Sequence, residues 1–93
     1  MKQIANDRKI TKSGNHVETL VDDEIVLMHI DSGKFFSLSE TSRRMWELLG
    51  EHDTLPSLVD AMAAEYEVKR GQCEAELTSV LLDLQERTLV TVS

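Results

Sequence analysis

The hydrophobic pattern changes its period at Leu38, and this change constrains the fold more than any other feature of the sequence. Between residues 16 and 38 the apolar residues come in short runs rich in Val, Ile, Leu and Thr, separated by polar turn residues. Such runs are typical of short strands joined by turns. Between residues 40 and 87 the apolar residues recur at spacings of three and four, which is typical of amphipathic helices. The sequence therefore predicts an α+β fold in which a small sheet precedes a group of helices.

Three strands are expected before the change of period. Residues 16–21 and 24–30 are separated by Asp22-Asp23 and predict a hairpin. A third short strand, 34–38, follows a turn in which Gly33 can take a positive φ. Because apolar residues alternate onto both faces of the 24–30 segment, we expect it to be the central strand of an antiparallel meander. The 34–38 strand then lies at an edge of the sheet.

Three helices are expected after Leu38, over residues 40–49, 55–66 and 72–87. Ser39 is suited to cap the first of them and Thr54 the second. The tail 89–92 has the β-branched composition of a strand and could pair with the sheet.

Leu82 lies outside the apolar stripe of the third predicted helix. At 100° per residue it falls about 140° from Leu77, on the same side as Ala75 and Ser79. An apolar side chain in that position could line a groove between this helix and the 34–38 strand, although scattered exposed leucines are common.

The length of 93 residues fits one small domain with one modest core. The first residues mix Lys, Asn, Asp and Ser around isolated apolar positions, and a Ser-Gly-Asn loop follows. We therefore expect a weakly ordered arm over residues 1–13 and a single domain over residues 14–93.

The charge is distributed unevenly, and it argues against nucleic acid as a partner. The chain carries 17 acidic and 10 basic residues, a net charge of −7. Residues 1–12 contain four bases and one acid, so residues 13–93 contain 16 acids and 6 bases, a net charge of −10. Binding to DNA, RNA or an anionic membrane depends on clustered Lys and Arg, which this part of the chain lacks.

No motif carries catalysis, so we expect a protein that is not an enzyme and that has no metal ion or cofactor. The lone Cys73 lies on the core stripe of the third helix, where a buried hydrophobe is expected. His16, His29 and His52 fall on different elements and show no metal-ligand spacing. The sequence contains neither a membrane-length apolar run nor the apolar stretch of a signal peptide, which predicts a cytoplasmic protein.

Two features allow more than one interpretation. Asp31-Ser32 superficially resembles the attachment site of an acyl carrier protein, but Gly33 and a strand follow it, which favours a hairpin turn. The edge strand 34–38 contains Phe35 and Phe36, and an exposed edge of this kind tends to aggregate. Either an arm or loop covers that edge, or a partner peptide adds to it as a further strand.

Residues 36–49, Phe-Ser-Leu-Ser-Glu-Thr-Ser-Arg-Arg-Met-Trp-Glu-Leu-Leu, resemble the aromatic-x-Leu-Asn-x-Thr-Gly-x-x-Ile-Trp-x-Leu-Leu pattern of the PqqD-like family. The resemblance continues in order through Thr54, the Tyr-Glu-Val at 66–68 and the Leu-Val pair at 89–90, and covers about residues 16–92. Ser39 replaces the usual Asn, Ser42 replaces a usual Gly or Ala, and Thr88 replaces the Gly that commonly precedes Leu-Val.

The resemblance implies a small winged helix-turn-helix domain that recognises the leader region of ribosomally made, modified peptides and performs no chemistry itself. In this family the leader adds as a strand to the third strand of the sheet and contacts the third helix. Carried onto this sequence, the peptide-binding residues are Lys34, Phe35, Phe36, Ser37 and Leu38 on the strand, with Ser79, Leu82, Asp83 and Glu86 on the helix.

The expected partners are a precursor leader peptide and a maturation enzyme, such as a leader peptidase, a cyclase of lasso-peptide type or a radical enzyme. A homodimer also stays open, because a free sheet edge can pair with its own copy. Two other functions remain as alternatives. A winged-helix transcriptional regulator fits the order of helices but not the charge. PqqD proper, in pyrroloquinoline quinone biosynthesis, carries an apolar-Pro-Glu segment near the third strand that this sequence lacks.

Overall fold

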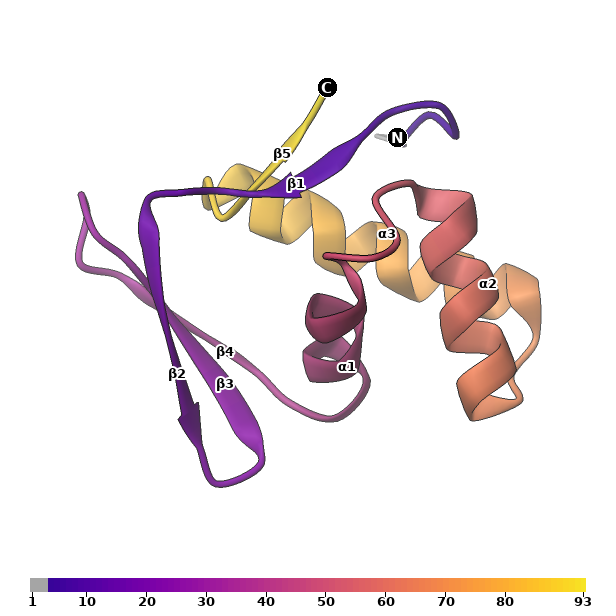
Figure 1. Cartoon of the computed structure of the whole chain (residues 1–93), viewed down its shortest axis with the longest axis horizontal. Coiled ribbons are helices and arrows are strands. Elements are labelled where there is room, and N and C mark those ends of the chain that lie inside the picture. The colour runs from indigo at the N-terminus through magenta and orange to yellow at the C-terminus, as the bar shows by residue number, and fades with distance from the viewer. Residues whose placement is uncertain (1–3) are drawn as a thin grey trace.

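A computed structural model describes residues 4–93 of the chain (Figure 1). Within these residues the elements follow the order β1 (Ile10–Lys12), β2 (His16–Val21), β3 (Glu24–His29), β4 (Phe35–Leu38), α1 (Glu40–Leu48), α2 (Leu55–Tyr66), α3 (Arg70–Glu86) and β5 (Val90–Val92). The α+β class and the three-stranded sheet followed by three helices and a short strand are confirmed. The helix α3 begins two residues earlier than the sequence predicts.

The three-stranded sheet has the order β2-β3-β4 and is antiparallel throughout. In the first hairpin His16 pairs with His29, and in the second Phe35 pairs with Met28. Gly33 has φ +70°, the conformation that the turn before β4 was expected to require. β3 is therefore the central strand, and β4 is an edge strand, as predicted from the apolar pattern.

The N-terminal segment differs from the expected weakly ordered arm. Residues 1–3 lie outside the described part of the chain, but residues 10–12 form β1, which pairs with β5 in a separate two-stranded sheet. Ile4 and Ile10 are buried, and Val90 of β5 is buried as well. The C-terminal strand thus pairs with β1 and not with the three-stranded sheet. Burial of these isolated apolar residues provides the stabilisation that their spacing alone did not reveal.

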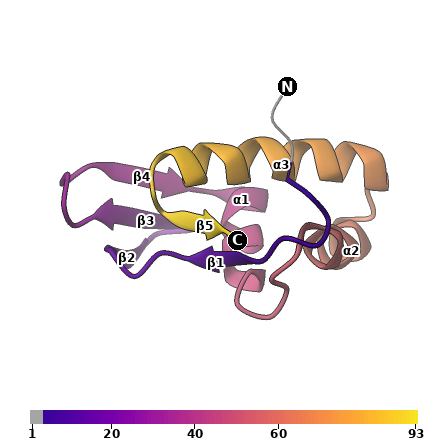
Figure 2. The same cartoon turned by 90° about the horizontal axis from the view of Figure 1, so that it is seen from above.

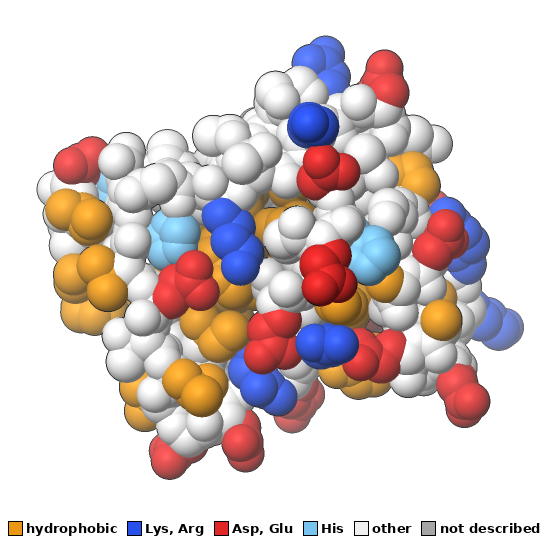
Figure 3. Space-filling model, viewed as in Figure 1, with side chains coloured by type: hydrophobic (Ala, Val, Ile, Leu, Met, Phe, Trp, Pro, Cys, Tyr) orange, Lys and Arg blue, Asp and Glu red, His pale blue; other side chains and the backbone are white. Residues whose placement is uncertain are grey.

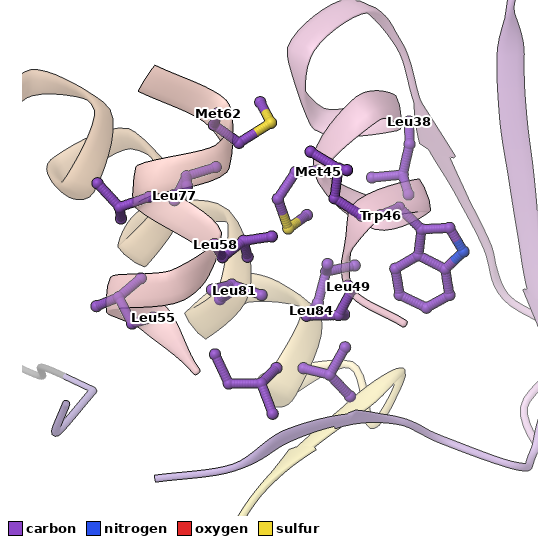
Figure 4. Close-up of a cluster of buried hydrophobic side chains, with 14 of the residues drawn as sticks. Leu38, Met45, Trp46, Leu49, Leu55, Leu58, Met62, Leu77, Leu81 and Leu84 are labelled. Atoms are coloured by element: carbon purple, nitrogen blue, oxygen red, sulfur yellow. The ribbon is translucent and has the colours of Figure 1, made fainter. Parts of the chain in front are cut away.

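One hydrophobic core joins the sheet to the helices (Figure 4). Met45 of α1 points toward α2 and α3, which contribute leucines such as Leu58 and Leu81, while Trp46 of the same helix lies on the side of Leu38 of β4. All of these side chains are almost completely buried. A short turn joins the end of α2 to the start of α3, and Glu67 in this turn has φ 54°.

Trp46 is fixed against the sheet by a small polar cluster. Its indole Nε1 donates a 2.9 Å hydrogen bond to Glu18 Oε1 of β2, and His16 Nε2 lies 2.9 Å from Glu18 Oε2. The Lys12 ammonium lies 4.7 Å from the centre of the indole ring. Partial burial raises the pKa of the Glu18 carboxyl, but the hydrogen bonds from His16 and Trp46 and the nearby charges outweigh this effect and hold the pKa below its usual value.

Candidate functional site

The outer edge of β4 is open in the part of the chain that the structure describes. β4 pairs with β3 along one side, while the other side faces the C-terminal end of α3 (Figure 2). β1, the strand that could have covered this edge, pairs with β5 instead. The sheet therefore keeps a row of unpaired backbone groups next to a helix.

The register identifies which backbone groups are unpaired. The His29 N–H donates to the Lys34 carbonyl at 2.9 Å, so residues 29 and 34 form a hydrogen-bonded pair. Because hydrogen-bonded and non-hydrogen-bonded pairs alternate in antiparallel sheets, Phe36 is the next residue bonded to β3. The N–H and C=O groups of Phe35 and Ser37 therefore point away from β3, toward the open edge. The two N–H groups can donate hydrogen bonds to an added strand, and the two C=O groups can accept hydrogen bonds from it.

The side chains of β4 alternate between two surfaces. Leu38 is 1% exposed and belongs to the core, while Phe36 is half-buried and packs against the core from the groove. Phe35 is 66% exposed and points to the other face of the sheet, where Met28 and Val17 are its neighbours in register. Several exposed apolar side chains gather on the sheet end of the molecule (Figure 3).

A groove of about 470 Å³ lies between the start of β4 and the last turns of α3. Its walls include five of the residues predicted to bind peptide, namely Lys34, Phe35, Phe36, Asp83 and Glu86. The structure therefore brings together strand and helix residues that are almost 50 positions apart in the sequence. Ser37 and Leu38 lie on the same strand but do not line the groove.

Arg87, just after the end of α3, contacts a residue of the strand β4 and a residue of the helix. Its guanidinium carbon lies 4.7 Å from the centre of the Phe36 ring, and its Nε donates a 3.2 Å hydrogen bond to Asp83 Oδ1. A guanidinium that stacks on an aromatic face and pairs with a carboxylate is held in one orientation. The stacked guanidinium therefore holds the Phe36 ring in place beside the groove.

Ser79 and Leu82 are placed elsewhere, which corrects the expectation that Leu82 lines the groove beside β4. Both residues line a second cavity, against Ile4–Asn6 and the N-terminal half of α3. Leu82 is half-buried and packs against the core. The reason is that the N-terminal segment, of which Ile4 is buried, lies against this side of α3, whereas the last turns of the helix extend beyond it toward β4.

The residues considered for chemistry are dispersed. Cys73 is buried, and burial, together with the nearby Glu76 carboxylate, raises the pKa of its thiol. His52 contacts Ser57 Oγ at 2.7 Å, and His16 contacts Glu18, so these two histidines have separate structural partners. Across residues 4–93, no three His, Cys, Asp or Glu side chains gather in a way that could hold a metal ion. None of the described helices has the length and apolar character needed to cross a membrane.

Five groove residues were not predicted from the sequence to bind peptide: His29, Ser32, Arg87, Thr88 and Leu89. His29 ends the central strand, and the other four lie in or beside turns. The departure from Gly at Thr88 was visible in the sequence, but its position opposite His29 depends on how α3 packs on the sheet.

The comparisons with known proteins agree with this architecture. Residues 24–90 match the family described as coenzyme PQQ synthesis protein D (PqqD). A solved structure described as TbiB1 in complex with the TbiA(beta) leader peptide is 36% identical, with a TM-score of 0.79 over 86% of this chain and 93% of that chain. A lasso peptide synthetase B1 complexed with a leader peptide is 19% identical, with a TM-score of 0.79 over 89% of this chain and 98% of that chain. A search of curated proteins finds no match.

The fold and the open edge define a small winged helix-turn-helix domain with a groove between its third sheet strand and its third helix. The match over residues 24–90 and the 36% identical structure place the chain within this class. The chain belongs to the PqqD family.

Proposed function

We propose that this protein binds the leader region of a ribosomally synthesised precursor peptide and presents the peptide to a maturation enzyme. The leader adds as a strand to β4 and contacts the last turns of α3. The observation that carries this proposal is the geometry of the edge: the backbone groups of Phe35 and Ser37 are free along the outer edge of β4, and the start of this strand borders a groove whose opposite wall is a helix. The complex of the 36% identical protein with a leader peptide supports the same use of this fold.

Backbone pairing alone does not provide useful affinity. The two free residues offer up to four hydrogen bonds, which contribute about 4 kcal/mol at roughly 1 kcal/mol net for each bond. Association itself costs an estimated 4–15 kcal/mol. Apolar leader side chains, at about 1.5–3 kcal/mol for each one fully buried, must therefore supply the remainder and select the sequence.

The two surfaces of β4 determine where those leader side chains lie. Successive residues of an added strand alternate between the faces of the sheet. One set enters the groove beside Phe36 and the aliphatic part of Arg87, and the other set lies beside Phe35 on the outer face. We therefore expect leaders that carry apolar residues at alternate positions over the segment that pairs with β4.

The role in maturation is presentation and not catalysis. The groove contains carboxylates, an ion-paired arginine and hydroxyl groups. Ser32 Oγ lies 3.0 Å from His29 Nδ1, but the other ring nitrogen of His29 contacts the Thr88 hydroxyl and not a carboxylate, so these residues do not form a Ser-His-Asp triad. We propose that a separate leader peptidase or a cyclase of lasso-peptide type acts on the bound precursor, and that both proteins work in the cytoplasm.

The structure gives little support to DNA binding by the helix pair. α2 contains no Lys or Arg, and the bases on or directly beside α3 are Lys69, Arg70 and Arg87. Arg70 pairs with Asp60 at 2.9 Å and Arg87 with Asp83 at 3.2 Å. Both guanidinium groups are thus paired with neighbouring carboxylates, and Lys69 alone does not make a basic helix face for phosphates.

Titration calorimetry with the TbiA(beta) leader peptide tests the proposal, with a peptide of the same composition in scrambled order as the control. We expect saturable binding of the leader and no binding of the scrambled peptide. Equal heats for both peptides, or no heat for either, would contradict leader recognition. A gel-shift assay with duplex DNA at low salt is expected to show no complex, whereas a discrete shift would favour the regulator.

A further inference from the structure

A continuous chain of hydrogen bonds runs through the wall of the groove between β4 and α3. His29 lies at the centre of this chain. Its Nδ1 lies 3.0 Å from Ser32 Oγ in the turn before β4, and its Nε2 lies 2.9 Å from Thr88 Oγ1 just after α3. Ser32 Oγ also accepts a 3.3 Å hydrogen bond from the Lys34 N–H. The chain therefore links the residue that precedes β4 to the end of α3.

The Arg87 carbonyl at the end of the chain can only accept, and this determines which group donates in each of the other bonds. The Thr88 hydroxyl donates to the Arg87 carbonyl at 2.6 Å, so its oxygen must accept from the Nε2–H of His29. The Nδ1 of His29 then carries a lone pair, which accepts the hydroxyl hydrogen of Ser32. Every donor in the chain finds an acceptor, and this satisfied arrangement fixes the orientation of the imidazole ring.

Thr88 adopts a backbone conformation that disfavours its own side chain. Its φ is 57°, in the left-handed region that glycine enters without strain and that β-branched residues rarely occupy. A threonine at this position adds strain to the turn, but it supplies the hydroxyl that bonds to His29 and to the Arg87 carbonyl. The strain therefore coincides with a contact that glycine cannot make.

We propose that His29 and Thr88 form a clasp, defined as the bond between His29 Nε2 and Thr88 Oγ1, that sets the groove for peptide binding. This inference rests on the proposed leader-binding function. By holding the β3–β4 turn against the end of α3, the clasp fixes the distance between the open strand edge and the helix wall. His29 and Thr88 are positioning residues, because they act through the placement of Phe36 and of the β4 backbone. A preformed groove lowers the ordering cost of binding.

Three substitutions at Thr88 test separately the effects of its hydroxyl group, its β-branched shape and its strained backbone conformation on peptide binding. Thr88→Val keeps the β-branched shape and loses the hydroxyl, Thr88→Gly relieves the strain and loses the hydroxyl, and Thr88→Ser keeps the hydroxyl. We expect Thr88→Val and Thr88→Gly to bind the TbiA(beta) leader about fivefold more weakly, the effect of about one hydrogen bond. Thr88→Ser should restore most of the wild-type affinity. Thr91→Val, which removes an exposed hydroxyl from β5, is the matched control.

A double-mutant cycle in binding distinguishes positioning from a general structural role. His29→Phe keeps an aromatic ring and removes both nitrogen atoms, and it should weaken binding about as much as Thr88→Val. The combined variant should be no weaker than either single variant, because each already breaks the same bond. Additive losses, or wild-type affinity in Thr88→Val and Thr88→Gly, would overturn the clasp while leaving leader binding intact. Failure of the wild-type protein to bind the leader would contradict the proposed function itself, and circular dichroism verifies that each variant is folded.

Discussion

Replacing Ser37 with proline is expected to remove one hydrogen-bond donor from the open edge without breaking the sheet. By the register of β3 and β4, the Ser37 N–H points toward the open edge and not toward Val26. Proline has no N–H and is tolerated on an edge strand when that group faces outward. The Ser37→Pro variant should therefore fold and yet bind the leader less tightly.

The size of the effect follows from the number of free edge groups. Phe35 and Ser37 together offer four such groups, so the substitution removes one bond of about 1 kcal/mol. The pyrrolidine ring also occupies the space where the carbonyl of the incoming strand would lie, which weakens an adjacent bond. The total loss is about 1–2 kcal/mol, and the dissociation constant should rise about 5-fold to 30-fold.

Titration calorimetry of the TbiA(beta) leader against two variants measures this loss. Ser37→Ala is the matched control, because it also removes the 3.2 Å hydrogen bond from Ser37 Oγ to Glu24 but keeps the backbone N–H. We expect wild-type affinity for Ser37→Ala and the reduced affinity for Ser37→Pro. If the folded Ser37→Pro variant binds as tightly as Ser37→Ala, the leader does not pair with β4 at this residue and the edge geometry is not the basis of recognition.

Three further predictions concern the scaffold. Because the pKa of Glu18 is lower in the folded state, its carboxylate stabilises the fold above the ordinary value of 4.5, and this contribution is lost as the pH falls through the folded value. Urea unfolding at pH 7 and pH 3 should thus show a smaller acid-induced loss in Glu18→Gln than in the wild type; equal losses would refute this. Burial and a raised thiol pKa should make Cys73 react slowly with iodoacetamide at pH 7 unless urea is added, and rapid native labelling would contradict its placement. Leu81→Ala, at a fully buried position, should lower the free energy of unfolding by about 2–5 kcal/mol in urea titrations, and a change below about 1 kcal/mol would show that the site is not in the core.

The sequence predicted the elements that depend on local pattern. The strands predicted at 16–21 and 34–38 are short apolar runs bounded by turn residues, and the helix predicted at 55–66 has helical periodicity and a capping residue, so their positions were confirmed almost residue by residue. The order of the sheet followed from the apolar residues on both faces of its central strand. These features require only short-range information.

The parts that could not be predicted depend on long-range packing. The partner of β5 is β1, whose isolated Ile10 gives no periodic signal, and the segment around Ile4 covers the side of α3 that carries Leu82. The 100° spacing of helical residues correctly placed Leu82 outside the main apolar stripe of α3, but it could not show that another segment of the chain lies against this residue. Likewise, the bond between His29 and Thr88 joins residues 59 positions apart and appears only once α3 packs on the sheet.

Amide hydrogen exchange at β4, measured with and without the TbiA(beta) leader, tests the central claim most directly. In the free protein the amide of Phe36 is bonded to β3, whereas the amides of Phe35 and Ser37 are open to exchange at the edge. Leader binding should slow exchange strongly at Phe35 and Ser37 and change it little at Phe36. Protection that appears elsewhere, with unchanged exchange at Phe35 and Ser37, would contradict recognition by strand addition to β4.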